Sequence, residues 1–176
     1  MTATTDSAPA PIEVDRRAAL TWALIGSVVI FFVGSFLHFT FELSGYRTWV
    51  AAFSAVNESA WEHLKMFYFP AAALALIQHG FLRDKVHNYW YAVGAGLLIV
   101  PGGILASFYM YLGIVLPIWG KGTLALDIGT AVFGVALAQW ATYRLWVGEE
   151  RAPWKKWTML GANVALLVAM LTLTAW

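Results

Sequence analysis

The chain has 176 residues, of which 60% are hydrophobic and only 12% are charged, and its mean hydropathy is +0.66. Soluble domains carry about 25% charged residues, so this composition excludes an ordinary soluble fold and predicts a membrane protein. The net charge of +1 predicts no nucleic-acid partner. Because the chain has no cysteine, disulfides, thiolate zinc sites and iron–sulfur clusters are excluded. Any metal must therefore be held by histidine, carboxylate or backbone oxygen.

The chain divides into a short polar segment and a long apolar one. Residues 1–15 are rich in Thr, Ala, Pro and Ser and are predicted to form a disordered cytoplasmic tail. Residues 16–176 are predicted to form a single transmembrane domain. About 20 apolar residues cross a bilayer as a helix, and five runs qualify: 18–43, 61–82, 89–116, 123–147 and 157–176. The predicted fold is an all-α, polytopic membrane helix bundle of five transmembrane helices.

Two of these runs contain residues that shape helix packing. Pro101-Gly102-Gly103 in the third run predicts a kink or a locally unwound turn at mid-membrane. In the fourth run, Gly129 and Gly134 accompany many alanines, which favours close helix packing.

The basic residues predict an orientation. Alternation of the five runs places eight of the eleven Lys and Arg residues on one side of the membrane: Arg16, Arg17, Arg83, Lys85, Arg144, Arg151, Lys155 and Lys156. The other side receives Arg47, Lys65 and Lys121. Since cytoplasmic loops carry the excess of positive charge, the N-terminus is predicted to be cytoplasmic and the C-terminus outside. The expected location is the bacterial cytoplasmic (inner) membrane, with the lipid bilayer as partner.

The most informative stretch is residues 57–65, Asn-Glu-Ser-Ala-Trp-Glu-His-Leu-Lys, which opens the second run. Two carboxylates, a histidine and a lysine crowd these nine positions. Ionisable groups near a membrane are costly, so they usually face a bundle interior and serve a function. In the predicted orientation, this stretch lies at the outer end of the bilayer. There it meets His38 and Glu42 from the first run and Asp127 from the fourth.

Histidine and carboxylate ligands together suit zinc, manganese or iron. We therefore expect this outer cluster to bind a divalent metal ion, with a ligand or general base that activates a metal-bound water. The expected metal ligands are His38, Glu58, Glu62 and Asp127, and the candidates for a further ligand or general base are His63 and Glu42.

The spacing within the cluster constrains which side chains share a helix face. Glu58 and Glu62 share a face only if the helix already runs at Glu58. His63 points about 100° away from Glu62, so these two cannot bind one ion from a regular helix without help from other helices.

Structural roles compete with metal binding for some of these residues. Ser59 and Glu62 have the spacing of a capping box, in which Glu62 reaches back to the N-cap. Glu62 and Lys65 also form an ordinary i,i+3 pair. His38 lies in a Phe-rich helix, where a hydrogen-bonded interior histidine is as common as a ligand.

The motif Val-Asn-Glu-Ser-x-Trp-Glu-His-Leu-Lys, preceded by His38 and Glu42, resembles that of an uncharacterised family of small bacterial multi-pass membrane proteins. The resemblance covers most of the chain from the first run onward. It implies a multi-pass membrane fold and no particular reaction. Its signature positions here are Asn57, Glu58, Ser59, Trp61, Glu62, His63 and Lys65.

Three functions remain open from the sequence. The first is a metal-binding membrane protein of unknown reaction with its site facing outward. The second is an accessory or structural subunit of a larger membrane complex, with protein partners. The third is cation or proton transport, although few polar residues continue the path across the membrane. Whether the protein is an enzyme stays open.

Overall fold

A computed structural model describes residues 12–174, which form six α-helices. In chain order these are α1 (Arg16–Leu43), α2 (Thr48–Ala51), α3 (Ala60–Leu82), α4 (Tyr89–Trp119), α5 (Leu124–Trp146) and α6 (Lys155–Thr172). The predicted all-α class is confirmed for this part of the chain. Residues 1–11 of the predicted disordered tail lie outside the described residues.

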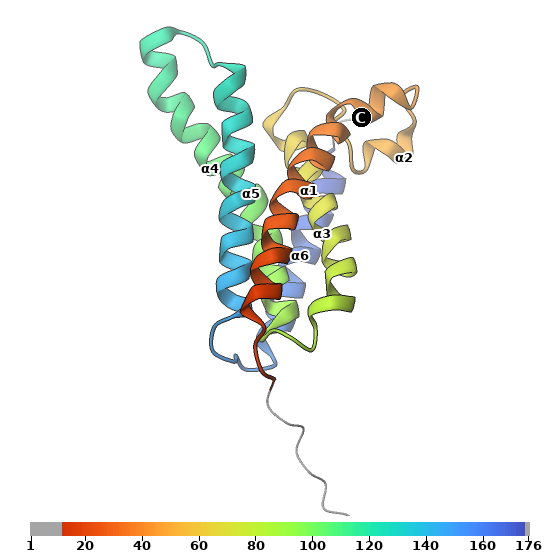
Figure 1. The fold of residues 1–176 in the computed structure, drawn as a ribbon. Coiled ribbons are helices and arrows are strands. Elements are labelled where there is room, and N and C mark those ends of the chain that lie inside the picture. The colour runs from red at the N-terminus through yellow and green to blue at the C-terminus, as the bar shows by residue number, and fades with distance from the viewer. Residues whose placement is uncertain (1–11, 175–176) are drawn as a thin grey trace, which may run out of the picture.

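The five long helices alternate in direction along the chain (Figure 1). One end of the bundle, drawn uppermost, holds the links 44–59 and 120–123, and we name it the upper end. The lower end holds the start of α1 and the links 83–88 and 147–154. The upper end therefore holds the ionisable side chains of His38, Glu58, His63 and Asp127.

Polar side chains fix where several helices begin. Asp15 accepts a hydrogen bond from the backbone N–H of Ala18 at 2.9 Å and so caps α1. Ser59 caps α3 by accepting from the N–H of Glu62 at 3.3 Å. Such caps satisfy backbone donors that the first helical turn leaves unpaired. The predicted N-cap at Ser59 is confirmed, and α3 consequently begins at Ala60.

Three helices, α1, α4 and α5, are long and apolar enough to cross a membrane, so the chain is a multi-pass membrane protein in contact with lipid. The two other expected spans, α3 and α6, are helices at the expected places. They do not meet the same criteria of length and composition. Both helices are long enough, and polar residues lower their hydropathy: α3 contains Glu62, Lys65 and Gln78, and α6 begins with Lys155 and Lys156.

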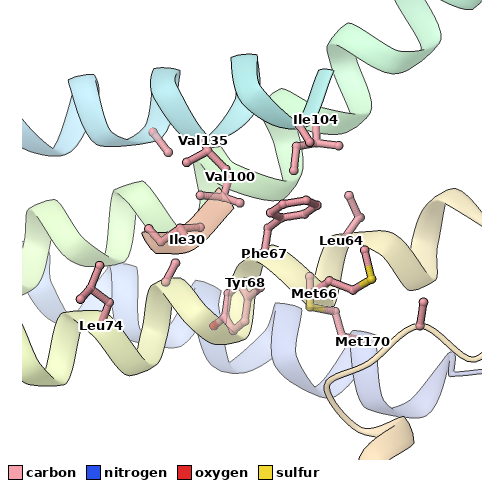
Figure 2. Close-up of a cluster of buried hydrophobic side chains, with 14 residues drawn as sticks. Ile30, Leu64, Met66, Phe67, Tyr68, Leu74, Val100, Ile104, Val135 and Met170 are labelled. Carbon is pink, nitrogen blue, oxygen red and sulfur yellow. The ribbon is translucent and has the colours of Figure 1, made fainter. Parts of the chain in front are cut away.

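The helices meet around one buried apolar cluster near mid-bundle (Figure 2). Ile30 of α1, Phe67 of α3, Val100 of α4, Val135 of α5 and Met170 of α6 all belong to it. Lipid tails are as apolar as these side chains, so close van der Waals packing holds the helices together.

Helix α4 changes direction between Val100 and Ile104, the segment that contains Pro101 (Figure 2). Its upper part leans away from α1 and α3 (Figure 1). The expected kink is present, but the alternative of an unwound turn is wrong, since α4 stays helical throughout. Near the bend α4 crosses α5, where a Cβ on Gly103 would lie 3.2 Å from the Cα of Gly134. Gly129, the other glycine expected to pack closely, is exposed with open space around it.

Candidate metal centre

Glu58 lies just before α3, in the link that follows α2. The side-chain oxygen of Asn57 accepts the backbone N–H of Ser59 at 3.0 Å, and Ser59 is extended with φ −71° and ψ 144°. Glu58 is therefore outside the helix and does not share a helix face with Glu62. A shared helix face for Glu58 and Glu62 required a helix that already runs at Glu58, and α3 begins only at Ala60.

Three side chains from two parts of the chain converge at the upper end. Each of His38, Glu58 and His63 offers one ligand atom, and these atoms lie within 4.8 Å of one another. The Glu58 carboxylate bridges the two rings, with Oε1 at 3.7 Å from Nε2 of His38 and Oε2 at 3.6 Å from Nε2 of His63. The two ring centroids are 5.1 Å apart. This arrangement forms a His/Glu/His group that can hold a metal ion.

A backbone carbonyl orients one of the two imidazoles. Nδ1 of His63 lies 2.7 Å from the carbonyl oxygen of Ser59, one helical turn earlier. A carbonyl only accepts, so Nδ1–H donates, and Nε2 is the ring nitrogen that faces Glu58. Metal-ligating histidines commonly have this arrangement, in which the second nitrogen donates to a carbonyl or carboxylate. The Ser59 carbonyl thus orients His63 with Nε2 toward the group, as metal binding through that nitrogen requires.

The separations are wider than those around a bound ion: the two His–Glu distances run to different oxygens of Glu58, and the three ligand atoms lie within 4.8 Å of one another. Tetrahedral zinc with bonds of about 2.0–2.1 Å places its ligand atoms about 3.3 Å apart. The two His–Glu distances, 3.7 and 3.6 Å, exceed this by a few tenths of an ångström. The side chain of Glu58 is 84% exposed, so it is free to move and an ion can approach from solvent. Three protein ligands leave one position open, as in catalytic zinc sites.

Glu62 was expected among the ligands, but the structure places it in a buried ion pair. Its Oε2 lies 2.7 Å from Nζ of Lys65, and both side chains are at most 1% exposed. The same carboxylate accepts the backbone N–H of Val56 at 3.1 Å. Lys65 also donates to the carbonyl of Ala51 at 2.6 Å and to Oγ1 of Thr174 at 3.0 Å. This pair fastens the link before α3 and the end of α6 to α3.

Glu62 therefore forms the expected i,i+3 pair with Lys65. The expected capping box is only half formed. Ser59 caps the helix, but the Glu62 carboxylate reaches Val56 and not the N–H of Ser59. Because Lys65 is committed to Glu62, it does not neutralise Glu58. A carboxylate beside two imidazoles supplies the donor atoms that a divalent cation accepts.

A cavity of about 710 Å³ is lined by His38, Glu58 and His63 and also by Asp127 of α5. Asp127 is not one of the three converging groups. Its Oδ1 accepts a hydrogen bond from the hydroxyl of Tyr111 on α4. Glu42 is exposed one turn beyond His38 and is not among the described residues that line the cavity. The structure thus brings His38, Glu58 and His63 together, and leaves Glu62, Asp127 and Glu42 outside the group.

The sequence left His63 as a candidate for a further ligand or general base, while the structure brings it into the converging group. Its offset of about 100° from Glu62 indicated that the two cannot bind one ion from a regular helix without help from other helices. The N-cap signal at Ser59 decides between them, since it places Glu58 before the helix and leaves His63 one turn inside it.

Residues 14–176 match the model of a family of unknown function, DUF6512. The chain belongs to DUF6512. The expected membership of an uncharacterised family is thereby shown, and the three candidate membrane helices agree with the membrane fold that the resemblance implied. None of the curated proteins matches the chain, and none of the solved structures does so. What this DUF6512 protein does must follow from the chemistry of its own residues.

Proposed function

We propose that this protein is a membrane protein that binds one divalent metal ion through His38, Glu58 and His63. The observation that carries the proposal is the convergence of three ligand atoms within 4.8 Å, from residues as far apart as His38 and His63. Two imidazole nitrogens and one carboxylate oxygen are the ligand set of many zinc sites with an open position. Manganese and iron accept the same donors, so the donor set favours zinc without excluding them.

The proposal includes a topology of five spans, with the N-terminus in the cytoplasm and the C-terminus outside. The alternating directions of the five long helices support it (Figure 1). Eight of the eleven basic residues also belong to the lower end, and cytoplasmic loops carry the excess of Lys and Arg. The upper end, with the metal centre, would then face the periplasmic side of a bacterial inner membrane.

A bound divalent ion supplies Lewis acidity and lowers the pKa of a water in its open position. The chain's own contribution is to orient the ligands. The Ser59 carbonyl fixes the His63 ring, and the buried Glu62–Lys65 pair fixes the start of α3. Asp127 lies across the cavity and is available as a hydrogen-bond acceptor. We therefore place the reacting part of any substrate between the two walls of this cavity.

Transport of ions is less well supported by the same cavity. Its lining includes Phe67, Ile104 and Ala131, which also belong to the buried apolar cluster. A cation moving inward from the metal centre would meet these apolar side chains, and losing its hydration there would cost free energy.

Metal analysis of the purified full-length protein tests the proposal. After incubation with zinc and removal of excess, we expect about one ion per chain. Glu58→Gln and His63→Gln should each lower zinc affinity by at least about tenfold, because even loss of an outer-shell partner has that effect. Asp84→Asn is the matched control, since Asp84 is an exposed carboxylate at the lower end. Equal metal content in the wild type and Glu58→Gln would overturn the proposal.

A further inference from the structure

A cavity of about 710 Å³ lies at the upper end, between the α1–α3 pair and the α4–α5 pair. It forms where the upper part of α4 leans away from α1 and α3 (Figure 1). Its volume is in the range of small-molecule sites, which is about 300–1,000 Å³. The metal centre lies on its wall, so whatever occupies the cavity reaches the metal.

Most of the cavity is apolar and part of it is deeply enclosed. Phe67, Ile104 and Ala131 line it and also belong to the buried cluster (Figure 2). Phe31 and Phe108 add aromatic surface from α1 and α4. A hydrocarbon chain inserted here would be surrounded by side chains, unlike a bulk lipid lying against a single helix.

The polar groups of the cavity come from two facing walls. Ser35, His38, Glu58 and His63 come from the α1–α3 side, and Tyr111, Asp127 and Thr130 come from the α4–α5 side. Tyr111 donates to one oxygen of Asp127, which leaves the carboxylate further lone pairs to accept from a ligand hydroxyl. The cavity therefore has the two parts that an amphiphile requires, an apolar chamber and a polar head site.

The charge at the head site favours a neutral head. Histidines that bind a metal are neutral, so a divalent ion balances the carboxylates of Glu58 and Asp127. Lys121, near the lining residue Gly122, is exposed and is not among the described lining residues. Hydroxyl groups on the head can donate to Asp127, and their oxygens can face the ion. A dianionic phosphate head would instead be repelled by Asp127.

The cavity is also open to the bilayer. Three of its lining side chains, Phe39, Leu124 and Ile128, are 55%, 75% and 47% exposed. They belong to α1 and α5, two of the helices able to cross a membrane. A lipid can therefore enter sideways without leaving the hydrophobic layer.

We propose that this cavity binds a neutral, hydroxyl-bearing, single-chain lipid of the monoacylglycerol type, with the chain in the apolar chamber and the head at the metal centre. This inference rests on the proposed metal site, because the ion completes the head site. It names the class of substrate or ligand on which that site acts.

A monoacylglycerol with a photoreactive group at its chain end is the probe. The zinc-loaded full-length protein is reconstituted in vesicles and irradiated, and the labelled peptides are identified. We expect labelling of lining segments of α4 and α5 that excess monoacylglycerol displaces and glycerol or a long-chain phosphate monoester does not. Ile128→Trp, which fills the cavity, should lower this displaceable labelling by about tenfold. Val132→Trp is the control, since Val132 is equally exposed on α5 at 48% but lies outside the lining.

Zinc content measured on the same samples separates the two proposals. Zinc bound by the wild type, with labelling that Ile128→Trp leaves unchanged, would overturn the lipid inference and leave the metal site intact. Displaceable labelling in a protein that binds no zinc would overturn the metal site and, with it, the head assignment. We expect both to be present, and Glu58→Gln to lower zinc binding and displaceable labelling together.

Discussion

At the scale of single residues, Glu58 and Glu62 lie on either side of the start of α3, and their carboxylates have different surroundings. Glu58 precedes the N-cap and is exposed, so water solvates its charge and a metal ion can reach it. Glu62 is inside the first turn and buried, so it needs Lys65 to compensate its charge. The two residues differ in burial and not in chemistry, and burial decides which of them can serve the metal centre.

The Glu62–Lys65 pair makes a first prediction. Lys65→Met leaves Glu62 buried without its partner, so it should destabilise the protein by about 3–5 kcal/mol. The double variant Glu62→Gln, Lys65→Met should recover much of this loss, because no uncompensated charge remains. The measurement is the free energy of unfolding in mixed micelles for both single variants and the double variant. Strictly additive losses would show that the two side chains do not act as a pair.

At the scale of helices, the crossing of α4 on α5 sets the width of the cavity. Gly134 permits the close approach, since a Cβ there would lie 2.8 Å from the backbone nitrogen of Ile104. Beyond this point the bent upper part of α4 leans away from α1 and α3 (Figure 1). A proline kink and a glycine contact together hold the cavity open.

The crossing makes a second prediction. Gly134→Ala forces the two helices apart, so it should lower stability by about 1–3 kcal/mol, the usual cost of overpacking. Gly129→Ala, five residues earlier on α5, meets open space and should raise stability by about 0.5–1 kcal/mol because alanine favours the helix. Thermal unfolding of the two variants in one detergent checks both signs. A Gly134→Ala protein as stable as Gly129→Ala would refute the close contact.

Much of the helical framework is predictable from the sequence, and the reasons are local. Runs of apolar residues give the five long helices, and an N-cap such as Ser59 gives the start of α3. The path of the link 44–59 is not predictable in this way. It depends on contacts distant in sequence, such as Lys65 with Ala51 and with Thr174. The position of Glu58 beside His38 and His63 follows from that path, which is why Glu62 and Asp127 were expected as ligands and His63 was left as a catalytic candidate.

At the scale of the whole molecule, the two ends of the bundle differ in charge. Basic residues concentrate at the lower end, while the His/Glu/His group lies at the upper end. Under the positive-inside rule, the topology that we propose would place the His/Glu/His group outside the cytoplasm.

The absence of cysteine from the chain makes this topology simple to test. Lys121→Cys introduces a thiol in the exposed upper link 120–123, and Asp84→Cys introduces one in the exposed lower link 83–88. A membrane-impermeant maleimide applied to intact spheroplasts should label Lys121→Cys at once, and Asp84→Cys only after permeabilisation. The reverse labelling pattern would show the opposite orientation, with the metal centre on the cytoplasmic side.

The central claim, a metal ion held by His38, Glu58 and His63, is tested most directly by X-ray absorption at the zinc edge on the loaded full-length protein. The predicted spectrum has two imidazole nitrogens and one carboxylate oxygen at about 2.0–2.2 Å, with a fourth light-atom ligand. In Glu58→Gln the bound zinc and its two-histidine signature should be lost together. A wild-type spectrum without imidazole scattering, or one unchanged in Glu58→Gln, would contradict the account.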